Sequence, residues 1–169
     1  MKAIVCSFIR DESLTEIANS LKLEKIDKLP YHITFYSFDL LDHKKRGLEE
    51  IVEKFNSSAM PLIVGVRGIE TTTYGTVRFS LENSNVLQEF HEKIVRGCNT
   101  IRNKDVESKA NQFYHEFSKE EQKLVDLYGR PNVMQRFRPH ITLGKTNSII
   151  EKKMDISISL DNLSVYYTD

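Results

Sequence analysis

The spacing of hydrophobic residues along the chain predicts strands and helices in mixed order. The run KAIVCSFI, from Lys2 to Ile9, predicts a strand, and from Asp11 onward the apolar residues recur at helical spacing. Two further helices are expected, from about Lys44 to Phe55 and from about Asn85 to Val95, each with one apolar side. Between those helices, PLIVGVRGIE and TYGTVRFSLE predict two strands joined by Thr-rich turn residues.

The segment from about Thr100 to Gln135 is the most polar part of the chain. Its pattern is helical from about Glu120 to Leu127, and Gly129 and Pro131 interrupt it. After this segment, FRPHITLGK returns to strand character and ISISLDNLSVYY predicts one final strand. We therefore expect a single domain over residues 1–169, with residues 100–135 as an insertion or lid.

Two of the predicted strands carry a related polar motif. Pro30-Tyr31-His32-Ile33-Thr34 is echoed by Pro139-His140-Ile141-Thr142. Because successive side chains of a strand point to opposite faces, His32, Thr34 and Tyr36 are expected to share one face, away from the core. The same alternation places His140 and Thr142 together on one face. The echo indicates a duplicated lobe.

The two motif histidines have the chemistry of an acid–base pair. An imidazole with an unperturbed pKa of about 6.5 can accept or donate a proton at neutral pH. Two of them on opposite sides of one phosphorus could take a proton from the attacking oxygen and give one to the leaving oxygen. A threonine hydroxyl two residues further along the strand can donate to a non-bridging phosphate oxygen. The candidate catalytic residues are therefore His32, Thr34, His140 and Thr142.

A purely structural role is the alternative for these histidines, because each ring could simply bond to the backbone. Both copies, however, also share an Ile between His and Thr, a nearby Pro before the His, and a predicted strand around them. These shared neighbours favour the catalytic interpretation.

Composition narrows the class of substrate. Lys plus Arg and Asp plus Glu both number 24, so the formal net charge is zero. A neutral chain has no overall field to hold a long nucleic acid, so we expect no binding of long duplex DNA and place any nucleotide at a local site. Cys6 and Cys98 lack the paired spacing of a zinc site and are too few for a disulfide framework, which favours a reducing, cytoplasmic location. A monomer is expected.

Neither a membrane anchor nor a metal site is expected from the sequence. The N-terminal apolar run is interrupted by Arg10 and Asp11, far short of the roughly 20 apolar residues that span a membrane. The remaining histidines show no ligand spacing with one another or with carboxylates, and we expect them to be surface or helix residues: His43, His91 and His115.

The two His-Ile-Thr motifs resemble those of the 2H phosphoesterase superfamily, which includes 2′-5′ RNA ligase-like proteins and 2′,3′-cyclic nucleotide phosphodiesterases. The resemblance covers nearly the whole chain, because the predicted elements around both motifs follow in the expected order. It implies a bilobal α+β fold, in which two antiparallel sheets with flanking helices are related by a pseudo-twofold axis. They would form a central groove with one motif on each wall. The resemblance also implies catalysis without a metal or cofactor.

Two other residues are candidates for substrate contact. Tyr36 is predicted on the His32 face of its strand and could stack on a base or bond a phosphate. Arg138, two residues before His140, could hold phosphate through its bidentate fork. Further cations that no motif supports are Arg67, Arg78 and Arg130.

Two functions remain open from the sequence. The first is a metal-independent phosphodiesterase that acts on a 2′,3′-cyclic phosphate or a 2′-5′ linkage of an RNA end or small nucleotide. The second is a non-catalytic binder of RNA ends or nucleotides. The intact pair of motifs favours the enzyme, because a binder needs no duplicated proton donor and acceptor, and Arg or Lys would hold phosphate better.

Overall fold

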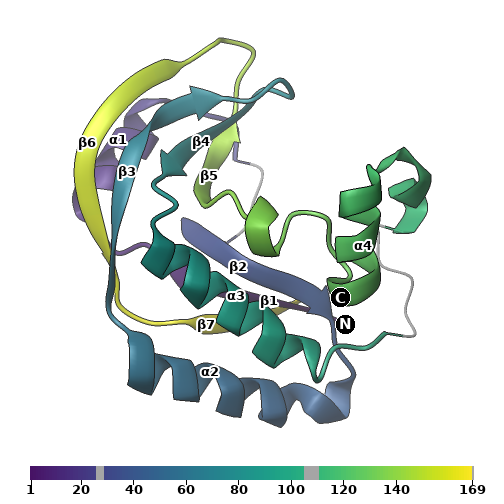
Figure 1. Cartoon of the computed structure of the whole chain (residues 1–169). Coiled ribbons are helices and arrows are strands. Elements are labelled where there is room, and N and C mark those ends of the chain that lie inside the picture. The colour runs from purple at the N-terminus through teal and green to yellow at the C-terminus, as the bar shows by residue number, and fades with distance from the viewer. Residues whose placement is uncertain (26–28, 105–110, 169) are drawn as a thin grey trace.

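The fold is α+β, as predicted, and is built on one antiparallel sheet (Figure 1). This computed structural model describes residues 1–25, 29–104 and 111–168. Among these residues, seven strands are hydrogen-bonded in the order β6-β3-β4-β5-β2-β1-β7, and every neighbouring pair is antiparallel. Their bounds are β1 Lys2–Phe8, β2 His32–Asp39, β3 Leu62–Thr71, β4 Thr76–Leu81, β5 His140–Lys145, β6 Glu151–Leu160 and β7 Ser164–Thr168.

The expected pair of lobes occurs as two halves of this sheet. One half holds β2, β1 and β7, and the other holds β6, β3, β4 and β5. The halves meet where β2 lies beside β5, and the register between these two strands is carried by one couple, Ile33 with Ile141. The two motif strands are therefore neighbours at the join.

In the described part of the chain, four α-helices accompany the sheet: α1 Glu12–Ser20, α2 Lys45–Ala59, α3 Asn85–Asn99 and α4 Lys119–Tyr128. The predicted first residues of α1 and α3 are confirmed, and a capping side chain precedes each helix. Asp11 accepts from the backbone N–H of Leu14 at 3.0 Å, and Ser84 accepts from that of Leu87 at 3.2 Å. Helices α2 and α3 both run further than their apolar stripes indicated. Short 3₁₀ turns cover Asp42–Lys44, Asn111–Glu116 and Met134–Arg136.

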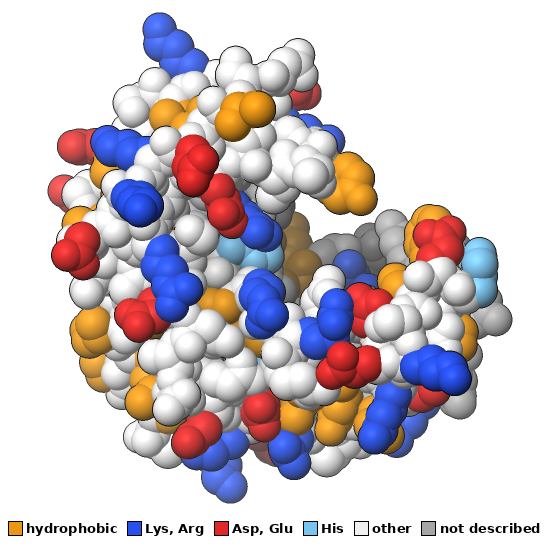
Figure 2. Space-filling view, turned by 45° about the horizontal axis from the view of Figure 1, so that its top comes forward, with side chains coloured by type: hydrophobic (Ala, Val, Ile, Leu, Met, Phe, Trp, Pro, Cys, Tyr) orange, Lys and Arg blue, Asp and Glu red, His pale blue; other side chains and the backbone are white. Residues whose placement is uncertain are grey.

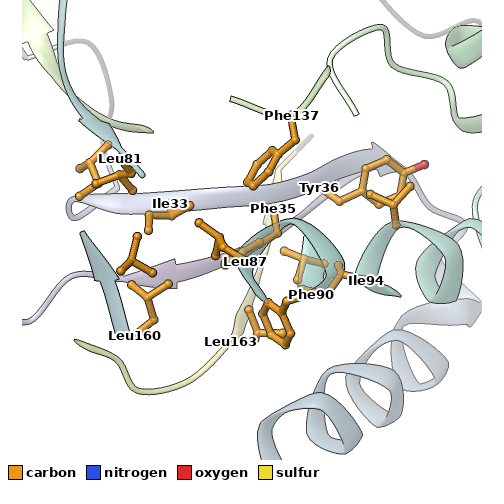
Figure 3. Packing of buried hydrophobic residues seen from close by; sticks show 14 of the residues in the cluster. Ile33, Phe35, Tyr36, Leu81, Leu87, Phe90, Ile94, Phe137, Leu160 and Leu163 are labelled. Carbon is orange, nitrogen blue, oxygen red and sulfur yellow. The ribbon is translucent and has the colours of Figure 1, made fainter. Parts of the chain in front are cut away.

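The core lies between the sheet and helix α3, with α2 packed behind α3 and against β7. The ring of Phe35, on β2, meets that of Phe90, on α3, edge to face at 5.3 Å between centroids. It also stacks on Phe137 at 6.2 Å, which ties the segment before β5 to the same core. Figure 3 shows Phe35 and Phe90 in the region of β2 and α3, and Phe137 beside β2. The face of β2 that carries Ile33 and Phe35 is thus fixed by packing, and the opposite face is free for polar side chains.

The prediction of one final strand over ISISLDNLSVYY was wrong. The segment forms two strands, β6 and β7, with a break from Asp161 to Leu163. Asn56 of α2 holds this break, because its side chain accepts from the N–H of Leu163 at 2.6 Å and donates to the carbonyl of Leu163 at 3.0 Å. Strand β6 then pairs with β3 and strand β7 with β1, at opposite edges of the sheet.

The polar segment predicted as a lid is only partly described, but its described part is joined to the core. Leu124 and Val125 of α4 are buried, as are Val133 and Met134 after it. The guanidinium of Arg136 pairs with Glu121 at 2.7 Å. This part of the segment therefore belongs to the folded body as well as to its surface.

Candidate active site

The two motifs come together because their strands are neighbours. In an antiparallel pair, the residues that flank a paired couple face each other on the same side of the sheet. Continuing the register from Ile33 and Ile141 places His32 across from Thr142, and Thr34 across from His140. The two histidines are then diagonal neighbours, a relation that separates Cα atoms by about 7–8 Å. Both isoleucines are fully buried and the four polar residues are half-buried or exposed, as the sequence predicted.

Each motif strand contains a bulge one residue after its threonine. Cys6 of β1 pairs with Thr34 but Val5 pairs with Tyr36, so Phe35 is an extra residue in β2. Likewise, β4 pairs Arg78 with Thr142 and Val77 with Gly144, so Leu143 is extra in β5. A bulge increases the local twist and redirects the side chains that follow it. The shared position of these bulges extends the internal repeat beyond the three motif residues.

Both histidine rings are oriented by the same backbone contact. Nδ1 of His32 lies 2.8 Å from the carbonyl oxygen of Pro30, and Nδ1 of His140 lies 2.8 Å from that of Arg138. A carbonyl oxygen only accepts hydrogen bonds, so Nδ1 carries the hydrogen in both rings. In the neutral ring, the lone pair is then on Nε2. The backbone contact that was the structural alternative therefore leaves one nitrogen of each ring available for acid–base chemistry.

The electrostatics of His140 favour its neutral form. Burial lowers its pKa below the ordinary value of 6.5, and the positive charges of Arg78 and His32 lower it further. The carbonyl of Arg138 and the carboxylate of Glu70 act in the opposite direction. Glu70 is itself paired with Arg78, at 2.7 Å between Oε1 and Nε. Arg78 thus acts on the pKa of His140 and is also paired with Glu70, which acts on that pKa in the opposite direction.

Tyr36 does not face the groove, which corrects the prediction that it contacts substrate. Its side chain is 2% exposed, stacks on Phe38 at 4.8 Å, and donates to the carbonyl oxygen of Tyr128 at 2.6 Å. Burial raises the pKa of its hydroxyl. The cause is the bulge at Phe35, which ends the simple alternation, so that both Phe35 and Tyr36 enter the core (Figure 3). Arg130 is also structural, because its Nε donates to the carbonyl of Ser37 at 2.9 Å.

Described residues line two cavities along the motif strands. The larger, which we call the α1-side cavity, has a volume of about 930 Å³ and contains both His32 and Thr142. Its other lining residues include Thr15 and Asn19 of α1 and, before β2, Pro30 and Tyr31. One cavity therefore holds residues of both motifs, with hydroxyl, amide and apolar groups around them.

The second, which we call the arginine cavity, has a volume of about 410 Å³ and lies over β3, β4 and the residues before β5. It holds Arg138, the predicted substrate contact, together with Arg67 and Arg78. No motif pointed to the last two, because only the order of strands brings β3 and β4 beside β5. In Figure 2, histidine side-chain surface is visible within a hollow, with Lys and Arg side chains beside it.

The segment that leads into the second motif is held by His91. Met134 has a φ of 54°, a conformation that residues other than glycine rarely adopt. Its N–H donates to Nε2 of His91 at 3.0 Å, and the ring of His91 stacks on that of Phe137 at 3.8 Å. The imidazole is fully buried, and burial lowers its pKa to about 4. His91 is therefore a neutral support for the chain that presents Arg138 and His140, which its helical position alone did not reveal.

Neither a metal-binding cluster nor a membrane-spanning helix occurs in the described part of the chain. No group of three or more His, Cys, Asp or Glu side chains in ranges 1–25, 29–104 and 111–168 is arranged so that it could hold a metal ion. Over the same ranges, no helix has the length and apolar character needed to cross a membrane.

Known proteins resemble this chain in sequence profile and in fold. The profile of the 2′-5′ RNA ligase superfamily matches residues 8–153, which include both motifs. The solved structure of TT0787 from Thermus thermophilus covers 98% of this chain with 87% of its own, at a TM-score of 0.67 and 12% sequence identity. At that identity the likeness concerns the fold alone. No curated protein sequence matches the chain. The profile match confirms the resemblance inferred from the two motifs.

Proposed function

The chain belongs to the 2′-5′ RNA ligase superfamily, and from this we propose that it is a metal-independent phosphodiesterase. Its substrate would be a 2′,3′-cyclic phosphate or a 2′-5′ linkage on an RNA end or small nucleotide. The observation that carries the proposal is the shared orientation of the two histidines. Each bonds a backbone carbonyl through Nδ1, on neighbouring strands, so that both Nε2 atoms are left for proton transfer.

In the proposed reaction, one histidine accepts a proton as the other donates one. For a cyclic phosphate, the base takes a proton from water, the water oxygen bonds to phosphorus, and one ribose oxygen leaves with a proton from the acid. The product keeps a single phosphate on the other ribose oxygen. We assign the base to His140, because its lowered pKa keeps it neutral at pH 7. His32 is then the acid.

The two threonines would stabilise the negative charge on the non-bridging oxygens of the phosphate. Each lies across from the histidine of the other motif, if the register at Ile33 and Ile141 continues by one residue. A phosphate that contacts both histidines would then place its non-bridging oxygens near the hydroxyls of Thr34 and Thr142. These hydroxyls can donate hydrogen bonds that strengthen as negative charge develops.

The α1-side cavity is the proposed site of a nucleoside. It adjoins His32 and Thr142 and offers the ring of Tyr31 for stacking. The amide of Asn19 can bond base or sugar atoms, and the hydroxyl of Thr15, which donates to the carbonyl of Asp11 at 3.0 Å, can accept from them. Mixed apolar and polar lining is what a nucleoside pocket requires.

The test is a screen of defined substrates with products identified by mass spectrometry. We would offer 2′,3′-cyclic mononucleotides, 2′-5′ and 3′-5′ oligonucleotides, and ADP-ribose cyclic phosphate. The proposal expects turnover of a cyclic phosphate or a 2′-5′ linkage, with one phosphate kept on the sugar. Binding of these ligands without turnover would support the non-catalytic binder instead. Inorganic phosphate as the first product would indicate another class of enzyme.

A further inference from the structure

The arginine cavity is joined to the second motif by the pairing of β4 with β5. Ser80 is the backbone partner of His140, and Arg78 is the partner of Thr142. Because paired residues project to the same face, the side chains of Ser80 and Arg78 lie on the motif side of the sheet. Both of them line the arginine cavity, together with Arg67 and Arg138. The cavity therefore continues the motif surface across β4 to β3, one to two strand spacings of about 4.8 Å from β5.

This cavity has positive charge that the protein does not neutralise. Arg78 is paired with Glu70, the one carboxylate among the described residues that line the cavity. Within the part of the chain that the structure describes, no ion pair involves Arg67 or Arg138, and Nη1 of Arg138 donates to the carbonyl of Phe137 at 3.1 Å. Both side chains belong to exposed residues and keep donors available. Two guanidinium groups in one concave site favour an anion with several oxygens, above all a phosphate.

A second polar group of the cavity lacks a partner. Asn83 lines the cavity, and its Nδ2 donates to Gln88 at 2.9 Å and to the carbonyl of Phe137 at 3.4 Å. Its Oδ1 is buried and, among the described residues, has no hydrogen-bond partner. Because this oxygen has almost no surface open to the cavity, Asn83 forms part of the cavity wall, and the two arginines supply the available donors.

The arginine cavity lies on the opposite side of the motif strands from the α1-side cavity. The latter adjoins β2 and α1, whereas the arginine cavity lies over β4 and β3, beyond β5 in the sheet. The ribose that carries the reacting phosphate can extend in two directions, through its base and through its 5′ oxygen. The base would lie by α1, and a phosphate on the 5′ oxygen would reach the arginines.

We propose that the arginine cavity binds a second phosphate of the substrate, through Arg67 and Arg138. The preferred substrate is then a nucleotide with a phosphate beyond the reacting one, such as an oligonucleotide end, and not an isolated cyclic mononucleotide. This inference rests on the proposed function for the position of the reacting phosphate. Its binding component does not depend on turnover.

The kinetic test compares substrates that differ only in the second phosphate. The three are a nucleoside 2′,3′-cyclic phosphate, its 5′-phosphorylated form, and a dinucleotide with the same cyclic end. Comparison of the last two substrates shows whether the cavity prefers a terminal phosphate or an internal one. We expect the better of these two substrates to have a kcat/KM about 10- to 100-fold above that of the nucleoside 2′,3′-cyclic phosphate. The gain should come mainly through a lower KM, and its size is that of one charged hydrogen-bonding contact.

Substitution at Arg67 should remove this preference. Arg67→Ala is expected to lower the ratio of the two kcat/KM values about 10- to 100-fold, and Arg67→Lys to keep part of it, since lysine retains charge without the fork. The matched control is Arg46→Ala, which removes one exposed arginine of α2 that pairs with Glu50 away from both cavities. An equal loss of preference in Arg46→Ala would attribute the effect to overall charge and overturn the inference.

A binding test separates this inference from the proposed function. By isothermal calorimetry, a nucleoside 3′,5′-bisphosphate should bind about 10- to 100-fold more tightly than the 3′-monophosphate, and Arg67→Ala should remove the difference. If cyclic phosphates turn over but neither test shows a preference, the second-phosphate site is wrong and the proposed function stands. If nothing turns over but the bisphosphate preference depends on Arg67, the site stands and the proposed reaction is wrong.

Discussion

The backbone of Ile33 pairs with that of Ile141, and this couple fixes how the two halves of the sheet meet. Both side chains are fully buried, so the polar residues on either side of each must point the other way. A register shift of one residue in either strand would turn the isoleucine of that strand toward water and its motif side chains toward the core. Burial of the two isoleucines on one face of the sheet therefore sets the positions of the motif side chains on the other face.

The first prediction concerns the two histidines as a unit. His32→Ala and His140→Ala should each lower the turnover rate by about 10²- to 10⁴-fold, the range for loss of one general acid or base. The double variant should lose far less than the product of the single losses, because proton transfer by the pair is already broken. Steady-state rates on a confirmed substrate, with folding checked by circular dichroism, give the answer. Full activity in either single variant would contradict the mechanism.

The second prediction concerns pH and the charges around His140. A base must be neutral, so kcat/KM should fall as pH decreases through the lowered pKa of His140, below 6.5. Arg78→Gln removes a charge that lowers this pKa and should move the acid limb to higher pH. Glu70→Gln removes a charge that raises it and should move the limb to lower pH. Shifts of both variants in the same direction would show that another group titrates.

The third prediction concerns metal ions. Because His32, His140 and the two threonines can supply the proton transfers and hydrogen bonds of the proposed reaction, activity should persist in excess EDTA with no divalent ion added. The measurement is the rate before and after chelation, on protein dialysed against chelator. Loss of activity that one divalent ion restores would contradict a metal-independent reaction.

Much of the candidate site could be predicted because each motif lies within a few consecutive residues of one strand. His32, Thr34, His140 and Thr142 follow the period of a strand, and the alternation held over those residues. The prediction that Tyr36 shares the face of His32 was wrong. The bulge at Phe35 depends on the pairing with β1, which has no local signal in the sequence. Arg67 could not be singled out, because its proximity to the second motif follows from the order of strands.

The same distinction applies to the fold. Helix starts at Asp11 and Ser84 were predictable, since a capping side chain acts on the residues directly after it. The break between β6 and β7 was not, because the two strands pair with partners at opposite edges and Asn56, far away in the sequence, holds the break. Tertiary contacts overrode the continuous β pattern of that segment.

The fourth prediction concerns the buried imidazole of His91. Its pKa is about 4 in the folded protein and about 6.5 when unfolded, so the unfolded chain binds an extra proton between these values. The free energy of unfolding should then decrease as pH falls from about 6.5 to about 4, by up to about 3 kcal/mol from this group. His91→Gln removes the titrating ring and keeps a polar side chain. Urea unfolding at several pH values should show a shallower pH dependence in the variant than in the wild type, and equal slopes would contradict the prediction.

The fifth prediction concerns the contribution of α4 to stability. Leu124 is 4% exposed and Leu127 is 49% exposed on the same helix, which makes them a matched pair. Leu124→Ala should lower the free energy of unfolding by about 2–5 kcal/mol, because it leaves a cavity in the core. Leu127→Ala should change it by no more than about 0.5 kcal/mol. If Leu124→Ala changed the free energy of unfolding as little as Leu127→Ala does, α4 would be an external lid alone.

Residues 151–168 provide both edge strands of the sheet, β6 on one side and β7 on the other. While the chain is being made on a ribosome, everything up to residue 150 can emerge before either edge strand exists. During that interval β3 and β1 each have one side without a partner, which is where a second nascent chain can pair and start aggregation. Only when these eighteen residues have emerged do β3 and β1 gain their second partners, and the exposed edges are then those of β6 and β7.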